Sequence, residues 1–208
     1  MTDIAIIDYG AGNIFSVKNA LDHLGVNSRL TSDKKVIEAA DAVILPGVGA
    51  FPAAMEELSK KGLVDVIKQQ AAVKPFLGIC LGMQMLFDKS FEFGECEGLG
   101  LIHGTVRRIE EPELVIPHMG WNKLVYTHDC ALTAKKTDND YVYFVHSYKA
   151  FCDNEDDNLY AYCEYGSRVT ALVSDGKYVY GSQFHPEKSG KVGLDMLRGF
   201  AALAEKNG

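Results

Sequence analysis

The sequence predicts an α/β fold in which a doubly wound, mostly parallel sheet is flanked by helices and the second half is β-rich. Short apolar runs alternate with amphipathic segments through residues 4–80, which is typical of parallel strands covered by helices. Short strands separated by turns replace that alternation in the second half. The chain has 208 residues and shows no internal repeat or linker, so we expect one domain over residues 1–208.

The elements follow from hydrophobic periodicity and from the residues that interrupt it. In the first half we expect strands at 4–8, 26–30, 41–45 and immediately before Cys80, and helices at 14–24, 33–39, within 51–72 and over 81–87. In the second half we expect strands at 104–109, 121–126, 141–146, 159–165, 169–173 and 178–184. A hairpin turn at 174–177 joins the last two strands, and a helix over 189–206 closes the chain.

Composition excludes several classes of function. The net charge of −7 argues against a nucleic-acid backbone or an anionic membrane as a partner. Apolar runs are soon broken by proline, glycine or charge, so no membrane span is expected, and the first strand follows Met1 too closely for a signal peptide. The five cysteines are scattered and odd in number, which indicates a reduced, cytoplasmic protein.

No cofactor or metal is expected from the motifs. The segment 10–12 (Gly-Ala-Gly) follows the first strand, but Phe15 occupies the place of the third glycine of a dinucleotide fingerprint. No Cys-x-x-Cys or His-x-x-x-His spacing occurs, so a metal site is not predicted. The basic pairs at 107–108 and 135–136 are interpreted as solvated surface.

The most informative motif is Gly78-Ile79-Cys80-Leu81-Gly82, between a predicted strand and a predicted helix. A turn of this pattern holds a nucleophile in a strained, exposed conformation, and its glycines leave room for the crossing. The thiol would face a helix N-terminus, where unpaired N–H groups stabilise a thiolate. A cysteine beside glycines is commonly only a small core residue, so the motif needs support from elsewhere in the chain.

Two further segments supply that support. His185 and Glu187 are two residues apart, so in an extended segment they would point to the same side as a proton shuttle and its orienting carboxylate. The segment 46–49 (Pro-Gly-Val-Gly) follows a predicted strand, and its glycines allow backbone N–H groups to turn toward a bound carbonyl. Because ligands of open α/β sheets bind at the carboxyl ends of strands, this loop and Cys80 can meet. Together they favour nucleophilic acyl chemistry.

At this point the chain resembles the class I glutamine amidotransferases, and within them the glutaminase-subunit family of imidazole glycerol phosphate synthase. The segments that carry the resemblance run from one end of the chain to the other: 8–13 (DYGAGN), 46–51 (PGVGAF), 78–84 (GICLGMQ), 117–122 (PHMGWN), 143–148 (YFVHSY) and 183–189 (QFHPEKS). The segment 117–122 discriminates best, because sister glutaminases share the catalytic residues but not, as a rule, this segment.

The resemblance implies that Cys80 attacks the side-chain amide of L-glutamine, that His185 moves the protons and that Glu187 orients His185. It further implies an oxyanion hole from the backbone N–H groups of Val48 and Leu81. The glutamine-binding residues implied by the motif match are Gly47, Gly49, Gln84, Glu92, His146, Ser147 and Tyr148.

The resemblance also implies a partner. The family passes ammonia to a separate (β/α)8 cyclase subunit in histidine biosynthesis, so we expect a heterodimer with that subunit. The candidates for the docking surface are Asn13, Met119, Trp121, Asn122 and Lys188. One departure from the family pattern is Lys149, which stands where a second aromatic residue is expected after Tyr148 and bears on the pocket wall.

Other readings of the motifs stay open. A paralogous glutaminase subunit could feed ammonia to a different synthase, and the sequence does not exclude it. A sister glutaminase serving vitamin B6, anthranilate or purine synthesis is disfavoured by the segment 117–122. A free-standing Cys-His-Glu hydrolase of peptides or γ-glutamyl chains would need no partner, and a non-enzymatic binding module is disfavoured by the intact catalytic residues.

Overall fold

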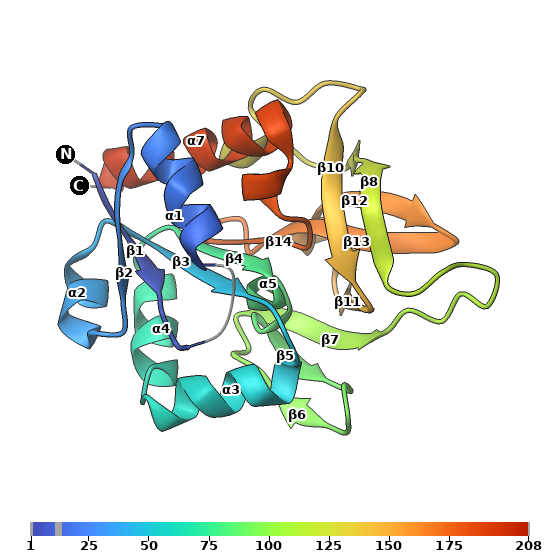
Figure 1. Cartoon of the computed structure of the whole chain (residues 1–208), viewed down its shortest axis with the longest axis horizontal. Helices are drawn as coiled ribbons and strands as arrows, with labels where there is room; N and C mark the ends of the chain where they lie inside the picture. The colour runs from blue at the N-terminus through green and yellow to red at the C-terminus, as the bar shows by residue number, and fades with distance from the viewer. Residues whose placement is uncertain (1, 11–13, 208) are drawn as a thin grey trace.

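The computed structural model describes residues 2–10 and 14–207, and its centre is an eight-stranded sheet (Figure 1). The strand order is β2-β1-β3-β4-β14-β13-β12-β9. The strands are β1 (Asp3–Ile7), β2 (Asn27–Thr31), β3 (Ala42–Gly47), β4 (Phe76–Cys80), β9 (Val125–Tyr126), β12 (Leu159–Tyr165), β13 (Ser167–Ser174) and β14 (Val179–Ser182). Pairing is parallel from β2 to β14 and antiparallel from β14 to β9, which agrees with the predicted, mostly parallel sheet.

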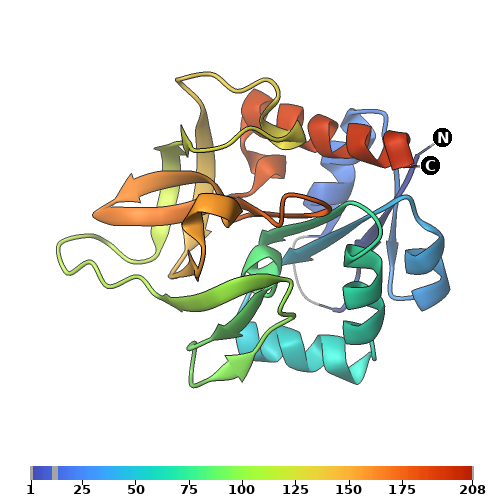
Figure 2. The ribbon, with the colours of Figure 1, turned by 180° about the vertical axis from the view of Figure 1, so that it is seen from behind.

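Helices cover both faces of this sheet (Figures 1 and 2). One face carries α1 (Ile14–His23) and α7 (Gly190–Asn207), and the other carries α2 (Lys34–Ala39), α3 (Phe51–Lys60) and α4 (Val64–Ala71). Alternate residues of a strand point to opposite faces. In β1, Ile4 and Ile6 therefore join the core under α1 and α7, whereas Ala5 and Ile7 join the core under α2, α3 and α4. The predicted double winding is confirmed.

The β-rich half adds two smaller sheets. One pairs β8 (His118–Lys123) with β10 (Tyr141–His146) in antiparallel fashion. The other has the order β11-β7-β5-β6, with β5 (Phe87–Ser90), β6 (Cys96–Glu97), β7 (Ile102–Arg108) and β11 (Tyr148–Cys152). Ser147 alone separates β10 from β11, so the chain changes sheets at that residue. The remaining short elements are α5 (Leu81–Gln84), α6 (Glu155–Asn158), η1 (Ala131–Thr133) and η2 (Pro186–Lys188).

Three expectations about secondary structure were wrong. The helix predicted over 81–87 ends at Gln84, and the chain enters β5, which pairs with β7. A short apolar run fits a buried helix or a buried strand equally well, so periodicity could not separate the two. The strand predicted over 121–126 is divided between β8 and β9, which belong to different sheets. Strands β5, β6 and β11 were not predicted.

The fold brings the predicted motifs to one edge of the central sheet. In the parallel pairing of β3 with β4, Leu45 is opposite Gly78 and Gly47 is opposite Cys80. Strand β14 flanks β4 on its other side and leads into His185. The carboxyl ends of three neighbouring strands therefore converge there, where open α/β sheets bind their ligands. Within the described residues, no helix is long and apolar enough to cross a bilayer.

Candidate active site

The turn after β4 holds Cys80 in a conformation that few residues adopt. Its φ is 56° and its ψ is −111°, and 6% of the residue is exposed. Positive φ is costly for a residue with a Cβ and is concentrated at functional turns. A Cβ on Gly82 would lie 1.8 Å from the carbonyl oxygen of Leu45, and one on Gly78 would lie 2.6 Å from the oxygen of Gly82. Only glycine fits at these two positions.

The helix that follows Cys80 is a single turn, because α5 ends at Gln84. The effect of a helix N-terminus depends on peptide dipoles aligned over successive turns. One turn therefore stabilises a thiolate less than the longer helix that the sequence predicted. Two other groups lie near the sulfur: the amide Nε2 of Gln183 at 3.9 Å and the carbonyl oxygen of Val145 at 4.0 Å.

His185 and Glu187 form a buried pair. The Nδ1 of His185 lies 2.8 Å from Oε1 of Glu187, and the two side chains are 3% and 1% exposed. The segment is not extended as predicted; Pro186 begins the 3₁₀ turn η2, which still directs the carboxylate back to the ring. Since a carboxylate accepts, Nδ1 carries the hydrogen and Nε2 is left to exchange protons. Nε2 has no hydrogen-bond partner within the described residues.

The electrostatics favour a charged His185. Burial lowers its pKa, but interactions with Cys80 and Glu187 outweigh burial and raise the pKa to about 9. The imidazolium is then the prevailing form at neutral pH, in keeping with a thiolate–imidazolium pair. Hydrogen bonding and charge interaction with Cys80 both contribute to the raised pKa, although Nε2 of His185 and the sulfur are not within ordinary hydrogen-bond geometry in this conformation.

The loop after β3 lies beside the nucleophile turn. Val48 is 41% exposed and Gly49 has a φ of 107°, and both residues line the same cavity as Cys80. Gly47 is buried at the end of β3, and a Cβ there would lie 2.8 Å from the hydroxyl of Tyr9 and 2.9 Å from the backbone nitrogen of Gly82. Gly47 therefore allows the loop to pass close to the turn without itself lining the cavity.

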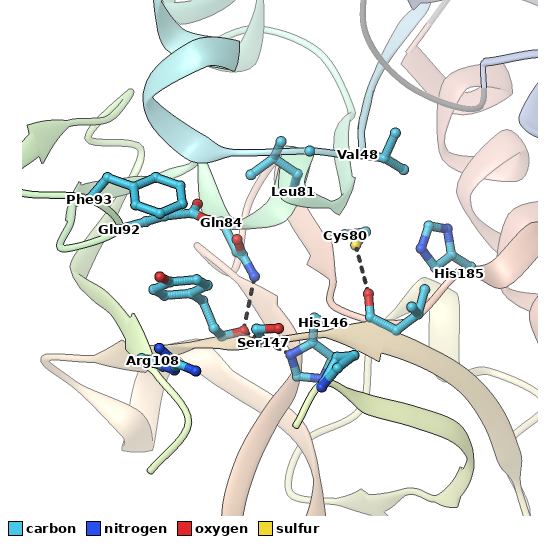
Figure 3. Close-up of a pocket in the computed structure, with 14 residues that line it drawn as sticks. Val48, Cys80, Leu81, Gln84, Glu92, Phe93, Arg108, His146, Ser147 and His185 are labelled. Carbon is cyan, nitrogen blue, oxygen red and sulfur yellow. Dashed lines mark hydrogen bonds between the residues drawn. The ribbon is translucent and has the colours of Figure 1, made fainter. Parts of the chain in front are cut away.

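A cavity of about 580 Å³ collects most of the predicted site residues (Figure 3). Its lining includes, among the residues predicted from the sequence, Val48, Gly49, Cys80, Leu81, Gln84, Glu92, His146, Ser147, Tyr148 and His185. Glu187 lies behind His185. Four lining residues were not predicted: Phe93, Arg108, Pro117 and Val145. Arg108 is exposed, as expected of a residue on the solvated surface, and it also lines the cavity. Its pairing opposite Tyr148 in the β7–β11 ladder brings it there, and local sequence carries no signal of that pairing.

The side chain of Glu92 lies at the start of a helix. Its Oε2 accepts a hydrogen bond from the backbone N–H of Phe51, the first residue of α3, at 2.7 Å. Its own N–H donates to the hydroxyl of Ser90 at 3.1 Å, and Glu92 is 8% exposed. A helix N-terminus stabilises negative charge. The cavity therefore has an anionic wall that suits an ammonium group.

Two buried histidines lie under the opposite wall. His146 donates from Nδ1 to the carbonyl of Tyr148 at 2.8 Å, and its Nε2 accepts from Nδ1 of His118 at 3.0 Å. The Nε2 of His118 in turn accepts from the amide of Asn122 at 3.3 Å. Burial lowers the pKa of His118 to about 4 and that of His146 to about 3, so both rings are neutral at pH 7. The role of His118 was not predicted from the sequence.

The comparisons with known proteins agree on the family. Residues 5–202 match the family model described as glutamine amidotransferase class-I. The chain belongs to the class I glutamine amidotransferase family.

Relatives in this amidotransferase family are close in sequence. The chain is 51% identical over 203 residues to the imidazole glycerol phosphate synthase subunit HisH of Bacillus cereus strain AH187, which covers 97% of this chain and 95% of that protein. The same subunit of Bacillus mycoides strain KBAB4 is 50% identical with the same coverage.

Solved structures share the amidotransferase fold. A glutamine amidotransferase structure superposes with a TM-score of 0.75 at 20% identity, covering 97% of this chain and 98% of that one. PurLQS from Thermotoga maritima gives a TM-score of 0.73 at 19% identity, with 96% and 97% covered. At these identities the likeness extends to the fold alone.

The residues predicted for docking differ in how exposed they are. Met119 and Trp121 lie on β8 and are 60% and 57% exposed, and Trp121 contacts Tyr143 edge-on. Asn122 is half-buried, and its amide donates to His118 and to the carbonyl of Glu164 at 2.9 Å. Lys188 is exposed, and Asn13 lies outside the described residues.

Two further expectations concern the surroundings of the site. Lys149 is buried, and its ammonium donates to the hydroxyl of Ser167 at 2.5 Å and to the carbonyl of Arg168 at 3.2 Å. It does not line the cavity, so the departure at this position leaves the pocket wall intact. In the described parts of the chain, no three His, Cys, Asp or Glu side chains cluster as metal ligands would.

Proposed function

We propose that this chain is the glutaminase subunit of an imidazole glycerol phosphate synthase. It hydrolyses L-glutamine to glutamate and ammonia and supplies the ammonia to a (β/α)8 cyclase subunit in histidine biosynthesis. The observation that carries the hydrolysis is the convergence of Cys80 and the His185–Glu187 pair, joined at 2.8 Å, on one cavity. Relatives at 51% identity that are named as subunits of this synthase support the choice of pathway.

The first half of the reaction forms a thioester. The Cys80 thiolate attacks the side-chain amide carbon of glutamine, and the backbone N–H groups of Leu81 and Val48 hold the oxyanion of the tetrahedral intermediate. The carbon–nitrogen bond then breaks as His185 gives its proton to the departing nitrogen, which leaves as ammonia. Glu187 stabilises the imidazolium and keeps the exchanging proton on Nε2.

The second half releases glutamate. The now neutral His185 takes a proton from water, whose oxygen attacks the γ-glutamyl thioester carbon. The carbon–sulfur bond breaks, and the thiolate–imidazolium pair is restored. Cys80 and His185 are almost fully buried, which keeps bulk water away from the thioester until a single water molecule enters the cavity.

The cavity suits a free amino acid. Glu92, held at the start of α3, pairs with the α-ammonium group, because a partly buried carboxylate and an ammonium stabilise each other. The substrate is further contacted by Gly49, Gln84, His146, Ser147 and Tyr148, which share the lining. Gly47 contributes by letting the oxyanion loop lie against the nucleophile turn. A peptide would place an uncharged amide against Glu92, so we expect free glutamine to be preferred.

The cyclase would dock on the outer face of β8 and β10. Met119 and Trp121 expose large apolar side chains there, and aromatic and Met residues are enriched in interface cores. Lys188, which is exposed, belongs to this surface in our proposal, and Asn122 supports it from within. Asn13 stays a candidate from the sequence alone. Direct transfer matters, because ammonia released into water becomes ammonium and loses its nucleophilicity.

Two broader features complete the proposal. Both cores pack on the same central sheet, which supports one amidotransferase domain over residues 1–208. All five cysteines are free, as expected in a reducing compartment, which supports a cytoplasmic location.

Glutamate release from glutamine is the decisive measurement. It is compared for the chain alone, for the chain with the (β/α)8 cyclase encoded in the same genome, and for that complex with the nucleotide substrate of the cyclase. We propose that a peptide of the loop 46–49 rests turned away from the pocket and that the loaded partner turns its N–H toward the oxyanion. We therefore expect the highest rate in the last case, because one oxyanion donor is worth about a hundredfold to a thousandfold. Cys80→Ala should lower the rate at least about a thousandfold but spare ammonia-driven synthesis.

The outcomes separate the alternatives. Full activity without any partner would replace the proposal with a free-standing hydrolase. If the chain is inactive with the cyclase but releases glutamate when combined with another synthase, it is a paralogous subunit. Glutamine hydrolysis that persisted in Cys80→Ala would remove Cys80 from the mechanism.

A further inference from the structure

A thiolate at Cys80 needs hydrogen-bond donors, and the fold leaves few candidates. Helix α5 is a single turn, and the N–H groups of Val48 and Leu81 are reserved for the substrate oxyanion. Of the two groups near the sulfur, the carbonyl of Val145 can only accept, so it favours the thiol. The imidazolium of His185 is one donor, but it gives up its proton during the reaction. Among the described side chains, the amide of Gln183 is a second donor that lies near the sulfur and keeps its hydrogens throughout.

The orientation of the Gln183 amide follows from a backbone carbonyl. The carbonyl of Tyr148 can only accept, so the atom of Gln84 that lies 3.0 Å from it must be the amide nitrogen. The same nitrogen lies 3.0 Å from the amide of Gln183, so the facing atom must be the oxygen of Gln183. The other end of that amide, Nε2, therefore faces the sulfur of Cys80 at 3.9 Å.

A flipped amide would be penalised at this position. It would bring two NH2 groups together, and Gln183 and Gln84 are 0% and 4% exposed, so solvent cannot compensate. Gln84 uses both of its amide hydrogens inside the protein, one on Tyr148 and one on Gln183. Only its oxygen remains available to a ligand.

The same carbonyl of Tyr148 is anchored from its other side. It also accepts from Nδ1 of His146, whose Nε2 accepts from His118, which accepts in turn from Asn122. Both rings stay neutral at working pH, so the directions of these hydrogen bonds do not change there. The carbonyl is thereby held in place, and with it the amides of Gln84 and Gln183.

We propose that Gln183 is a catalytic residue of this site, which donates a hydrogen bond from Nε2 to the Cys80 thiolate, and that Gln84 is the positioning residue that orients it. The inference rests on the proposed Cys80 chemistry. The donor favours the thiolate over the thiol and directs the sulfur toward the substrate carbon. His185 and Tyr9 are the titratable groups that interact with Cys80, and burial raises the pKa of Tyr9 so that its hydroxyl stays neutral.

The test is the pH dependence of alkylation of Cys80 by iodoacetamide, followed on the Cys80 peptide by mass spectrometry in the full-length chain. Gln183→Met keeps the approximate volume and removes the donor. A hydrogen bond to the charged sulfur shifts the equilibrium from thiol to thiolate by roughly tenfold or more. We expect the alkylation midpoint to rise by about one pH unit and the alkylation rate at pH values below the wild-type midpoint to fall about tenfold, with a loss of glutamate release.

Two further variants guard against misfolding and nonspecific effects. Gln84→Met/Gln183→Met removes both amides and leaves no orphaned donor, since His146 still satisfies Tyr148; it should show the same shift. Ser182→Ala is the matched control, because Ser182 is buried next to Gln183 but donates to the carbonyl of Phe184. Its midpoint should not move.

The proposal is overturned if Gln183→Met and the double variant alkylate with the wild-type midpoint, or if Ser182→Ala shifts it equally. Because alkylation needs neither glutamine nor a partner, this result is independent of whether glutamate release depends on a cyclase.

Discussion

Replacing Gly82 by alanine should separate the nucleophile from its oxyanion loop. The added Cβ would lie 1.8 Å from the carbonyl oxygen of Leu45, whereas nonbonded carbon–oxygen contacts are about 3.3 Å or longer. The turn that carries Cys80 and the strand β3 must therefore move apart by roughly 1.5 Å. Overpacking of this kind costs about 3 kcal/mol, and a misplacement of about 1 Å at a reacting group costs about a hundredfold in rate.

The assay combines thermal unfolding with glutamate release in the cyclase complex. For Gly82→Ala we expect the Tm to fall by about 6 to 12 °C and kcat/KM to fall at least about a hundredfold. Gly176→Ala is the matched control: Gly176 has a φ of 76° in the β13–β14 turn, and a Cβ there would meet nothing closer than 3.7 Å. It should cost about 1–2 kcal/mol and leave kcat/KM unchanged. Wild-type kcat/KM in Gly82→Ala would refute the reasoning.

Three further predictions follow from the site and the docking face. The pKa of His185 is raised from 6.5 to about 9, so the ring should lose the proton that the departing nitrogen needs as pH rises through about 9. The value of kcat/KM should therefore fall above about pH 9, and Glu187→Gln should move this fall to lower pH. Glu92→Gln should raise the KM for glutamine about tenfold or more with a smaller change in kcat, measured by steady-state glutamate release. Trp121→Ala should weaken cyclase binding by about 2 kcal/mol in titration calorimetry, whereas Phe151→Ala, also exposed but on β11, should not.

The pH prediction includes a statement about stability. A pKa of His185 that is higher in the folded chain means that folding is favoured wherever the imidazolium prevails. The contribution of the interactions of charged His185 with Cys80 and Glu187 is fully present below about pH 6.5 and is lost as pH rises through about 9. Thermal unfolding at a series of pH values measures this loss, and an unchanged slope in Glu187→Gln would contradict it.

Local sequence was sufficient for the parallel half of the fold and not for the β-rich half. Strand β3 could be predicted because its apolar run is bounded by a turn and is buried throughout. Strand β11 could not, because only Ser147 separates it from β10, and the bend at Ser147 that sends it to another sheet depends on its pairing with β7. The helix predicted after Cys80 failed for the same reason: β5 exists because β7, later in the chain, pairs with it.

The residues of the candidate site also differ in whether local sequence could identify them. Cys80 could be found because the glycines that its turn needs lie beside it in sequence. Gln183 was only part of a motif until the fold placed it against Gln84 and Cys80, which are separated from it by 99 and 103 positions. His118 likewise has a role only through His146, 28 positions away. Hydrogen bonds over such separations have no periodicity, so pattern analysis cannot detect them.

The register of β8 against β10 connects the proposed docking face to the surroundings of the nucleophile. Met119 is paired with Val145, and the carbonyl of Val145 lies 4.0 Å from the sulfur of Cys80. His118 is paired with His146, whose Nδ1 holds the carbonyl of Tyr148. Alternate residues of β8 therefore face the exposed surface, where we propose that the partner docks, and the buried hydrogen bonds under the cavity. If the proposed partner shifted β8, both the Val145 carbonyl and the Tyr148 carbonyl would be affected together, because the residues that contact them lie on one strand pair.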